Sequence, residues 1–147
     1  MAVVALLDVN VLVALFDPDH VHHDLAHDWF AADGAAGWAT CPLTENGFVR
    51  VVTHPQYQPN PPRPAVVLER LRKFCDGGRH QFWGDTISLR DESIFVSSVV
   101  SHRHLTDIYL LGLARKMGGR LATFDRSIAL DAVKGAKASH LLLIEPA

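Results

Sequence analysis

The chain has 147 residues, of which 48% are hydrophobic and 20% are charged, and its formal net charge is -2 at pH 7. This composition is typical of one globular domain with an apolar core, and it excludes an intrinsically disordered chain. The small negative net charge excludes a general electrostatic attraction for nucleic acid, so any basic contact surface must be local. Two cysteines, Cys41 and Cys75, are too few for a disulfide framework, and a reducing cytoplasmic compartment is the simpler expectation.

The N-terminal segment is apolar up to Phe16 except at Asp8 and Asn10. It lacks the positive charge that begins a secretory signal, and its two polar residues interrupt the apolar length that a membrane helix needs. Residues 3–7 (VVALL) instead predict a strand buried on both faces, as in a parallel sheet. A short helix is expected to follow over residues 11–16.

The rest of the chain alternates between helical and strand patterns. Apolar spacing and Gly or Pro breaks predict helices over residues 20–33, 43–52, 64–74 and 107–117, and strands over 38–40, 81–83, 120–124 and 141–144. Either Thr40 or Cys41 is expected to cap the helix that contains Pro42 in its first turn, and Thr106 is expected to cap the last helix. Residues 58–64 are a proline-rich loop, and residues 93–101 fit a helix or a strand equally well. This alternation predicts an α/β fold, a parallel sheet with helices on both faces.

Four carboxylates lie where predicted strands end or predicted helices begin, namely Asp8, Glu45, Asp107 and Asp125. Functional groups gather at the carboxyl ends of strands in such sheets, and helix N-termini tolerate carboxylates. In one pocket these groups would repel each other, and a divalent cation such as Mg²⁺ or Mn²⁺ would remove the conflict and activate water for phosphodiester hydrolysis. Taken singly, Asp107 and Asp125 are equally well explained as helix caps, and Glu45 is better explained as a solvated side chain. Asp8 is the exception, because a charge between two apolar runs rarely lacks a role.

Four segments resemble the motifs of PIN-domain proteins, and they are most similar to the toxin component of VapBC toxin–antitoxin pairs. The segments are LLDVNVLVAL at 6–15, TENGFVRV at 44–51, LTDIYLLGLA at 105–114 and LATFDRS at 121–127. They occur in the family's order and span most of the chain. The resemblance implies a single PIN domain over residues 1–147, with a parallel sheet of about five strands sandwiched by helices. It also implies a Mg²⁺- or Mn²⁺-dependent endoribonuclease.

The resemblance assigns roles to individual residues. The acids that it implies for metal binding and catalysis are Asp8, Glu45, Asp107 and Asp125. Asn10 and Thr123 match polar positions near the first and fourth acids, where they would orient the acids or a water molecule. Many family members carry another acid two positions after the fourth, and here that position is Ser127. This departure leaves open whether the site holds one metal ion or two.

RNA that approaches an acidic pocket needs cations nearby, and we predict that Arg126, Arg115 and Lys116 supply them. A solvated helix surface explains any one of them more simply, and Arg126 is the strongest candidate because it adjoins Asp125. The resemblance further implies a small VapB-type antitoxin that covers the site with a basic side chain, and a homodimer.

Other functions remain to be weighed against a ribonuclease. The dense histidine cluster His20, His22, His23 and His27 could be a transition-metal site, although a solvated helix start explains it more simply. A phospho-acceptor receiver would need a lysine after the last strand, where this chain has Glu145, and an aspartyl-nucleophile hydrolase would need a second acid where it has Asn10. The alternative that stays open is a PIN-like module that binds RNA or an antitoxin without cutting.

Overall fold

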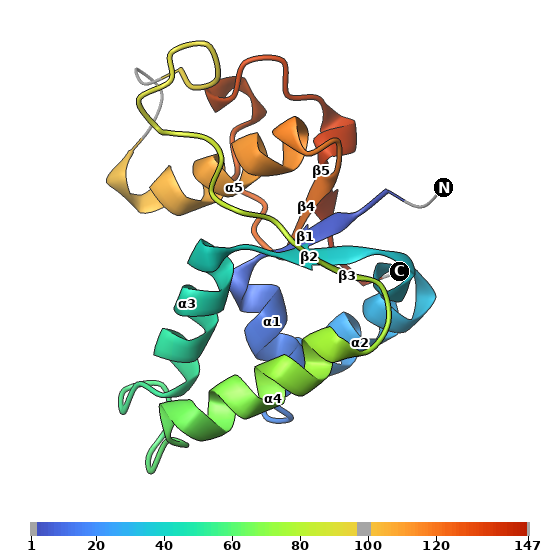
Figure 1. Ribbon diagram of the computed structural model, residues 1–147, viewed down its shortest axis with the longest axis vertical. Coiled ribbons are helices and arrows are strands. Elements are labelled where there is room, and N and C mark those ends of the chain that lie inside the picture. Colours follow the sequence, from blue (N-terminus) through green and yellow to red (C-terminus); the bar gives the residue numbers. More distant parts are fainter. Residues whose placement is uncertain (1–2, 97–100, 147) are drawn as a thin grey trace.

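The computed structural model describes residues 3–96 and 101–146. Its centre is a sheet of five parallel strands in the order β3-β2-β1-β4-β5 (Figure 1). The strands are β1 (Ala5–Leu7), β2 (Trp38–Thr40), β3 (His80–Phe82), β4 (Arg120–Thr123) and β5 (Leu141–Leu143). The predicted parallel sheet of about five strands is confirmed. Because β1 is the middle strand, Asp8 directly after it lies at the centre of the carboxyl edge of the sheet.

Helices cover both faces of this sheet, as predicted. They are α1 (Val9–Phe16), α2 (His23–Ala32), α3 (Pro42–Val52), α4 (Pro64–Asp76) and α5 (Leu105–Lys116). Helices α1 to α4 lie on one face, and α5 lies on the other together with the short 3-10 helices of the C-terminal part (Figure 1). Each face has its own apolar core. Among the described residues, no helix is long and apolar enough to cross a membrane.

The alternation of side chains along each strand decides which core a residue joins. On β1, Ala5 and Leu7 pack into the core under α1 to α4, whereas Leu6 packs into the core under α5. On β2, Trp38 faces the first core and Ala39 faces the second. Continuing this alternation by one residue places Asp8 on the α5 face of the sheet.

The start of α3 shows how local sequence fixes a helix close to the site. Cys41 is its N-cap residue, and Pro42 occupies the first turn, where a missing N–H costs nothing. The Cys41 backbone N–H donates to the Thr44 hydroxyl at 3.0 Å, and that hydroxyl donates to the Cys41 carbonyl at 3.1 Å. Of the two predicted caps, Cys41 is therefore the correct one. Both Cys41 and Cys75 are free thiols.

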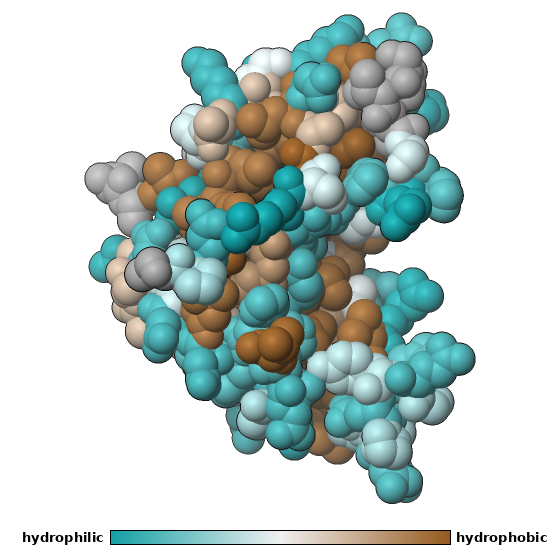
Figure 2. Space-filling model, turned by 180° about the vertical axis from the view of Figure 1, so that it is seen from behind, coloured by the Kyte–Doolittle hydropathy of each residue, from teal (hydrophilic) through white to brown (hydrophobic). Residues whose placement is uncertain are grey.

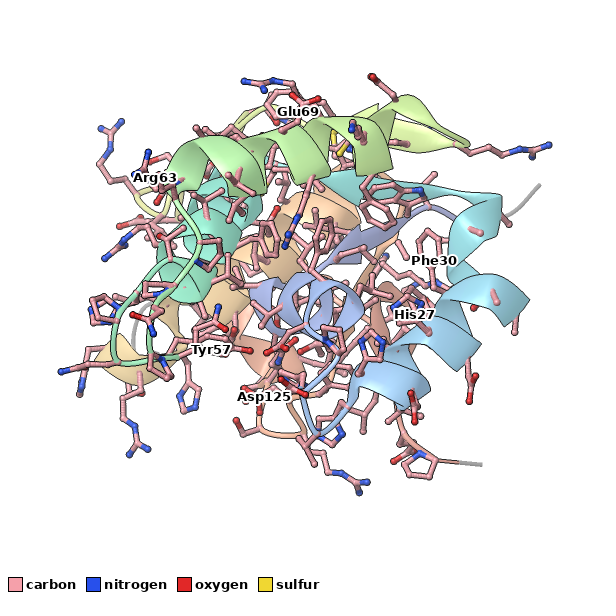
Figure 3. All side chains as sticks on the ribbon, turned by 90° about the horizontal axis from the view of Figure 1, so that it is seen from below. His27, Phe30, Tyr57, Arg63, Glu69 and Asp125 are labelled. Carbon is pink, nitrogen blue, oxygen red and sulfur yellow. The ribbon has the colours of Figure 1, made fainter. Side chains whose placement is uncertain are left out.

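Two histidines of the predicted cluster terminate α1. His23 Nδ1 donates to the Ala14 carbonyl and His27 Nε2 donates to the Leu15 carbonyl, each at 2.7 Å. Figure 3 shows His27 on α2, beside α1. Helix C-termini leave carbonyls without intrahelical donors, so these rings satisfy groups that would otherwise be buried unpaired. These two histidines therefore have a structural role in holding α2 against the end of α1.

Some predicted boundaries were wrong. Helix α5 begins at Leu105 with His104 at its N-cap, so Thr106 is not the cap. Helix α2 begins at His23 and not at residue 20, because turns occupy the residues between it and α1. Within the ambiguous stretch 93–101, residues 93–96 form a turn that ends in a single β-bridge from Phe95 to Val133, and residues 97–100 lie outside the described residues.

Candidate metal centre

Asp8 is the most buried acid of the chain that the structure describes, with 5% of its surface exposed. Its Oδ2 accepts a hydrogen bond from the Thr123 hydroxyl at 2.7 Å, and its Oδ1 accepts one from the Val9 N–H at 2.8 Å. Burial raises the pKa of this carboxyl, the two donors lower it, and the charge of Asp125 raises it, with a net upward shift. Asp8 is thus fixed in position by β4 and by the first turn of α1.

Asp107 reaches the same place from α5, the helix that covers this face of the sheet. It lies in the first turn of α5, whose N-terminus favours a carboxylate. Burial, then the charge of Asp8, then a hydrogen bond to Asp125 raise the pKa of Asp107 to about 7. In the protein without metal, Asp107 therefore holds a proton to a much higher pH than an ordinary aspartate does.

Asp125 completes a group of three acids after β4. The N–H and hydroxyl of Ser127 both donate to its Oδ1, at 2.8 and 2.6 Å, and lower its pKa. Its own N–H donates to the Thr123 hydroxyl at 3.1 Å, so Thr123 joins Asp8 to Asp125. Ser127, which stands where many family members have an acid, here orients Asp125. The orienting role of Thr123 stays a prediction, which its hydrogen bonds to both acids support.

Glu45 has other hydrogen-bond partners than these three acids. Thr40 is on the α1–α4 face of β2, and its hydroxyl donates to Glu45 Oε2 at 2.7 Å and contacts His80 Nε2 at 2.8 Å. Among the described residues, the interactions that shift the pKa values of the three aspartates do not include Glu45. Burial and then the charge of Glu45 raise the pKa of Cys75 on α4, so Glu45 faces that thiol. Among the described residues, the three aspartates therefore interact with one another, whereas Glu45 interacts with Thr40 and Cys75.

The residues around Asp8 and Asp107 suit a hard divalent cation. The same hollow is lined by Asn10, whose Oδ1 is buried and has no hydrogen-bond partner among the described residues. Buried polar atoms are rarely left without a partner, and carboxylate and amide oxygens are the donors that Mg²⁺ and Mn²⁺ prefer. Within residues 3–96 and 101–146, no three His, Cys, Asp or Glu side chains stand in the arrangement of a metal site. Holding an ion therefore requires these side chains to turn toward it.

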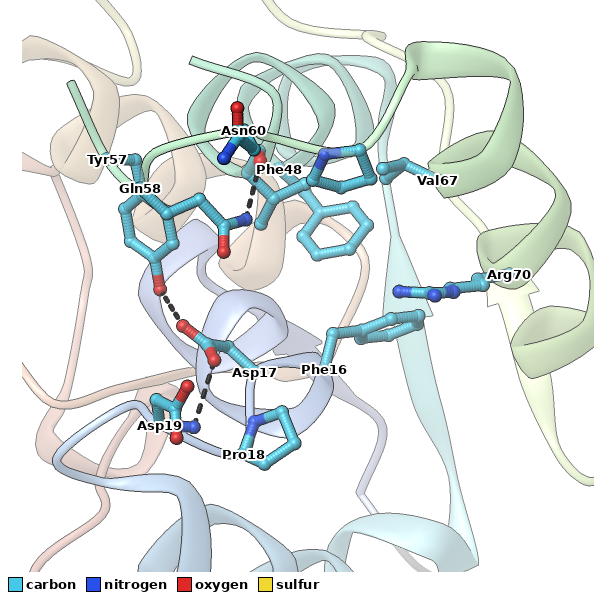
Figure 4. Close-up of a pocket in the computed structure, with 12 residues that line it drawn as sticks. Phe16, Asp17, Pro18, Asp19, Phe48, Tyr57, Gln58, Asn60, Val67 and Arg70 are labelled. Atoms are coloured by element: carbon cyan, nitrogen blue, oxygen red, sulfur yellow. Dashed lines mark hydrogen bonds between the residues drawn. The ribbon is translucent and has the colours of Figure 1, made fainter. Parts of the chain in front are cut away.

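Sequence reasoning missed two residues that line this hollow, His20 and Tyr57. The Tyr57 hydroxyl donates to Asp17, and Figure 4 shows this bond at the corner of an adjoining hollow that Phe16 also lines. His20 Nδ1 accepts from the His22 N–H at 3.0 Å. Neither residue stands in a motif, because both lie in irregular segments that only tertiary packing brings to the sheet edge.

The predicted RNA-binding cations lie at two other places. Arg126 Nη2 pairs with Glu145 Oε2 at 2.9 Å on the surface. Arg115 and Lys116 are in the last turn of α5, roughly 12 Å along the helix axis from Asp107 in its first turn. The Lys116 ammonium donates to the Thr86 carbonyl at 3.1 Å. Arg115 and Lys116 are therefore placed to contact only RNA that extends well beyond the acids.

Comparison with known proteins agrees with this geometry. The model of the PIN domain family matches residues 5–134. Three relatives from Mycobacterium tuberculosis are similar over most of their lengths. Ribonuclease VapC44 is 46% identical over 138 residues (93% of this chain and 96% of the relative), Ribonuclease VapC38 is 47% identical over 124 residues (84% and 86%), and Ribonuclease VapC39 is 42% identical over 132 residues (89% and 95%). The chain therefore belongs to the PIN-domain family and, within it, to the VapC ribonucleases.

Proposed function

We propose that this chain is a Mg²⁺- or Mn²⁺-dependent endoribonuclease that acts as the toxin of a VapBC-type pair. The observation that carries the proposal is the group of three aspartates at the centre of the carboxyl edge of the sheet, in which Thr123 joins Asp8 to Asp125 and Asp107 interacts with both. Membership of the VapC ribonucleases supports the same reaction. A cluster of like charges costs stability unless a ligand compensates it, so its presence supports a cation site.

Asp8, Asp107 and Asp125 would hold the ion, with the Asn10 Oδ1 as a neutral donor. When bound, such an ion lowers the pKa of water and neutralises charge on the scissile phosphate. Thr123 holds Asp8 and Asp125 in position relative to each other, because its hydroxyl donates to Asp8 and accepts from the Asp125 N–H. The hollow beside Asp8 and Asn10 is open at the surface, so a phosphodiester can reach the acids.

The assignment of Glu45 as a fourth ligand stays a prediction. Its carboxylate is bonded to Thr40, and it would have to leave that hydroxyl to join the aspartates. The Glu45→Gln variant tests the assignment by its effect on metal affinity.

Incubation of the purified chain with a pool of cellular RNA tests the proposed reaction. Mg²⁺, Mn²⁺ and chelator are compared, and Asp8→Asn is assayed beside Asp28→Asn, a control on the exposed surface of α2. We expect metal-dependent cleavage that Asp8→Asn reduces about 100-fold or more and that the control leaves unchanged. Full cleavage by Asp8→Asn would overturn the assignment of the site. Metal-independent RNA binding without cleavage would favour the alternative, a PIN-like module that does not cut.

We further propose the partners and compartment that membership of the VapC ribonucleases suggests, namely a VapB-type antitoxin, a second copy of this chain and the cytoplasm. The homodimer is supported by a surface hollow that exposed apolar side chains line, including Leu89 and Leu105. Sedimentation analysis of Leu89→Asp tests this interface. A monomer is expected for the variant and a dimer for the wild type, and an unchanged mass would place the interface elsewhere.

A further inference from the structure

A groove along α3 adjoins the acidic hollow. It has a volume of about 570 Å³, and its polar side chains include Asn46, Arg50, His54 and Gln56; we call it the α3 groove. It shares four wall residues with the hollow that contains Asp8, namely Val9, Val51, Tyr57 and Thr106. Figure 2 shows the surface hollowed between the half of the molecule that contains α5 and the half that contains α3. A chain bound at the acids would therefore continue directly into the groove.

The charge of the α3 groove differs from that of the hollow next to it. None of the described residues that line it is an acid, and Arg50 gives it a guanidinium. The three ion pairs of the described residues involve other arginines, so Arg50 has no carboxylate partner among them. A polyanion repelled by three aspartates needs a cation close to them, and the groove supplies one. Arg126, by contrast, is paired with Glu145.

The other groove residues suit a nucleotide base. Asn46 and Gln56 offer amide groups whose side chains make no hydrogen bond with the described residues, so both donors and acceptors are available. Val9 and Leu43 add apolar surface for a flat ring. Sequence-specific binding of single-stranded RNA relies on this combination of planar hydrogen-bonding side chains and apolar contact. The groove volume lies within the range of pockets that hold one small ligand.

We propose that the α3 groove binds one unpaired nucleotide of the RNA substrate next to the scissile phosphate. Asn46 and Gln56 contact the edges of the base, and Arg50 contacts its phosphate. The proposal rests on the proposed ribonuclease function, and it makes these residues determinants of where the RNA is cut. A protein segment in the same groove is the competing occupant, but the available cation beside a phosphodiester-cleaving site favours RNA.

Binding is measured separately from cleavage, in the Asp8→Asn background. The probe is a pool of fluorescein-labelled single-stranded RNA 10-mers of random sequence, followed by fluorescence anisotropy. Arg50→Met is compared with Arg72→Met, which removes an equal charge from the exposed surface of α4, where Arg72 pairs with Glu69. We expect about a tenfold higher Kd for Arg50→Met and less than a twofold change for Arg72→Met. Equal effects of the two variants, or no RNA binding at all, would overturn the proposal.

Cleavage mapping gives a second readout in the otherwise wild-type chain. With a random-sequence RNA library, we expect Asn46→Ala to relax the preference at one nucleotide position beside the cut, while thermal unfolding shows that the fold is kept. If the wild type cuts but Asn46→Ala and Arg50→Met keep its sites and its affinity, the groove proposal fails and the ribonuclease stands. If the wild type does not cut but Arg50→Met alone weakens RNA binding, the ribonuclease proposal fails and the groove still binds RNA. Loss of antitoxin binding with RNA binding unchanged would make the groove a protein contact and overturn the proposal.

Discussion

Two threonine–carboxylate pairs stand at the carboxyl edge of the same sheet, on opposite faces. Thr123 donates to Asp8 at 2.7 Å on the α5 face, and Thr40 donates to Glu45 at 2.7 Å on the α1–α4 face. The surroundings differ, because two further aspartates join the first pair, whereas a histidine joins the second. The comparison shows that a shared local motif does not decide function. In the first pair, two further aspartates repel Asp8, and a bound cation would relieve this repulsion. In the second pair, Thr40 holds Glu45 and also contacts His80.

The largest expected effect is that of Asp107→Asn on catalysis. The variant keeps the size of the side chain but removes one of the three charges that would hold the metal. We expect RNA cleavage at saturating Mg²⁺ to fall about 100-fold or more, and Mn²⁺ affinity to fall with it. Single-turnover cleavage and calorimetric titration measure the two effects. A variant with wild-type cleavage would remove Asp107 from the site.

The two threonines give the most direct comparison of the two regions. Thr123→Val removes the hydroxyl that joins Asp8 to Asp125, and we expect cleavage to fall about 10- to 100-fold. Thr40→Val makes the same change beside Glu45, and we expect less than a threefold loss. Each variant should lose about 1 kcal/mol of unfolding free energy, since each loses a buried hydrogen bond. Equal losses of activity would show that Glu45 joins the aspartates during catalysis.

The burial of Asp107 and its repulsion by the neighbouring aspartates should also appear in the stability of the protein without metal. The pKa of Asp107 is about 7 in the folded chain, well above its ordinary value of 3.8, so folding favours its protonated form. The stability that this preference contributes is present at low pH and is lost as pH rises through about 7. In chelator, between pH 4 and 8, we expect the unfolding free energy of the wild type to fall by roughly 1–2 kcal/mol relative to that of Asp107→Asn. This is less than the change in pKa alone would give, because Asp107 is only half-buried and solvent screens its charge. A pH-independent difference between the two proteins in denaturant titrations would contradict this.

The smallest effect concerns the histidines that end α1. His27→Ala removes one donor to the Leu15 carbonyl, and we expect a loss of about 1 kcal/mol of unfolding free energy with cleavage unchanged. Denaturant titration and the RNA assay check the two parts. If Zn²⁺ restored the stability of His27→Ala or abolished its activity, the histidine cluster would instead have a role in metal binding.

The sequence predicted the sheet well because buried parallel strands read as short apolar runs. Asp8 was identifiable for the same reason, since a charge directly after such a run needs an explanation. The place of Glu45 was not predictable. The face of the sheet on which Thr40 lies depends on how β2 pairs with the neighbouring strands. A three-residue strand is too short for its sequence pattern to predict that face. His20 and Tyr57 reach the site through loop packing, which leaves no periodic signal.

The most direct test of the metal centre is the anomalous diffraction of crystals grown with Mn²⁺. We predict a peak bounded by Asp8, Asp107 and Asp125, close to the Asn10 side chain. A peak beside Thr40, Glu45 and His80 with none at the three aspartates would contradict the account, as would the absence of any peak at saturating Mn²⁺.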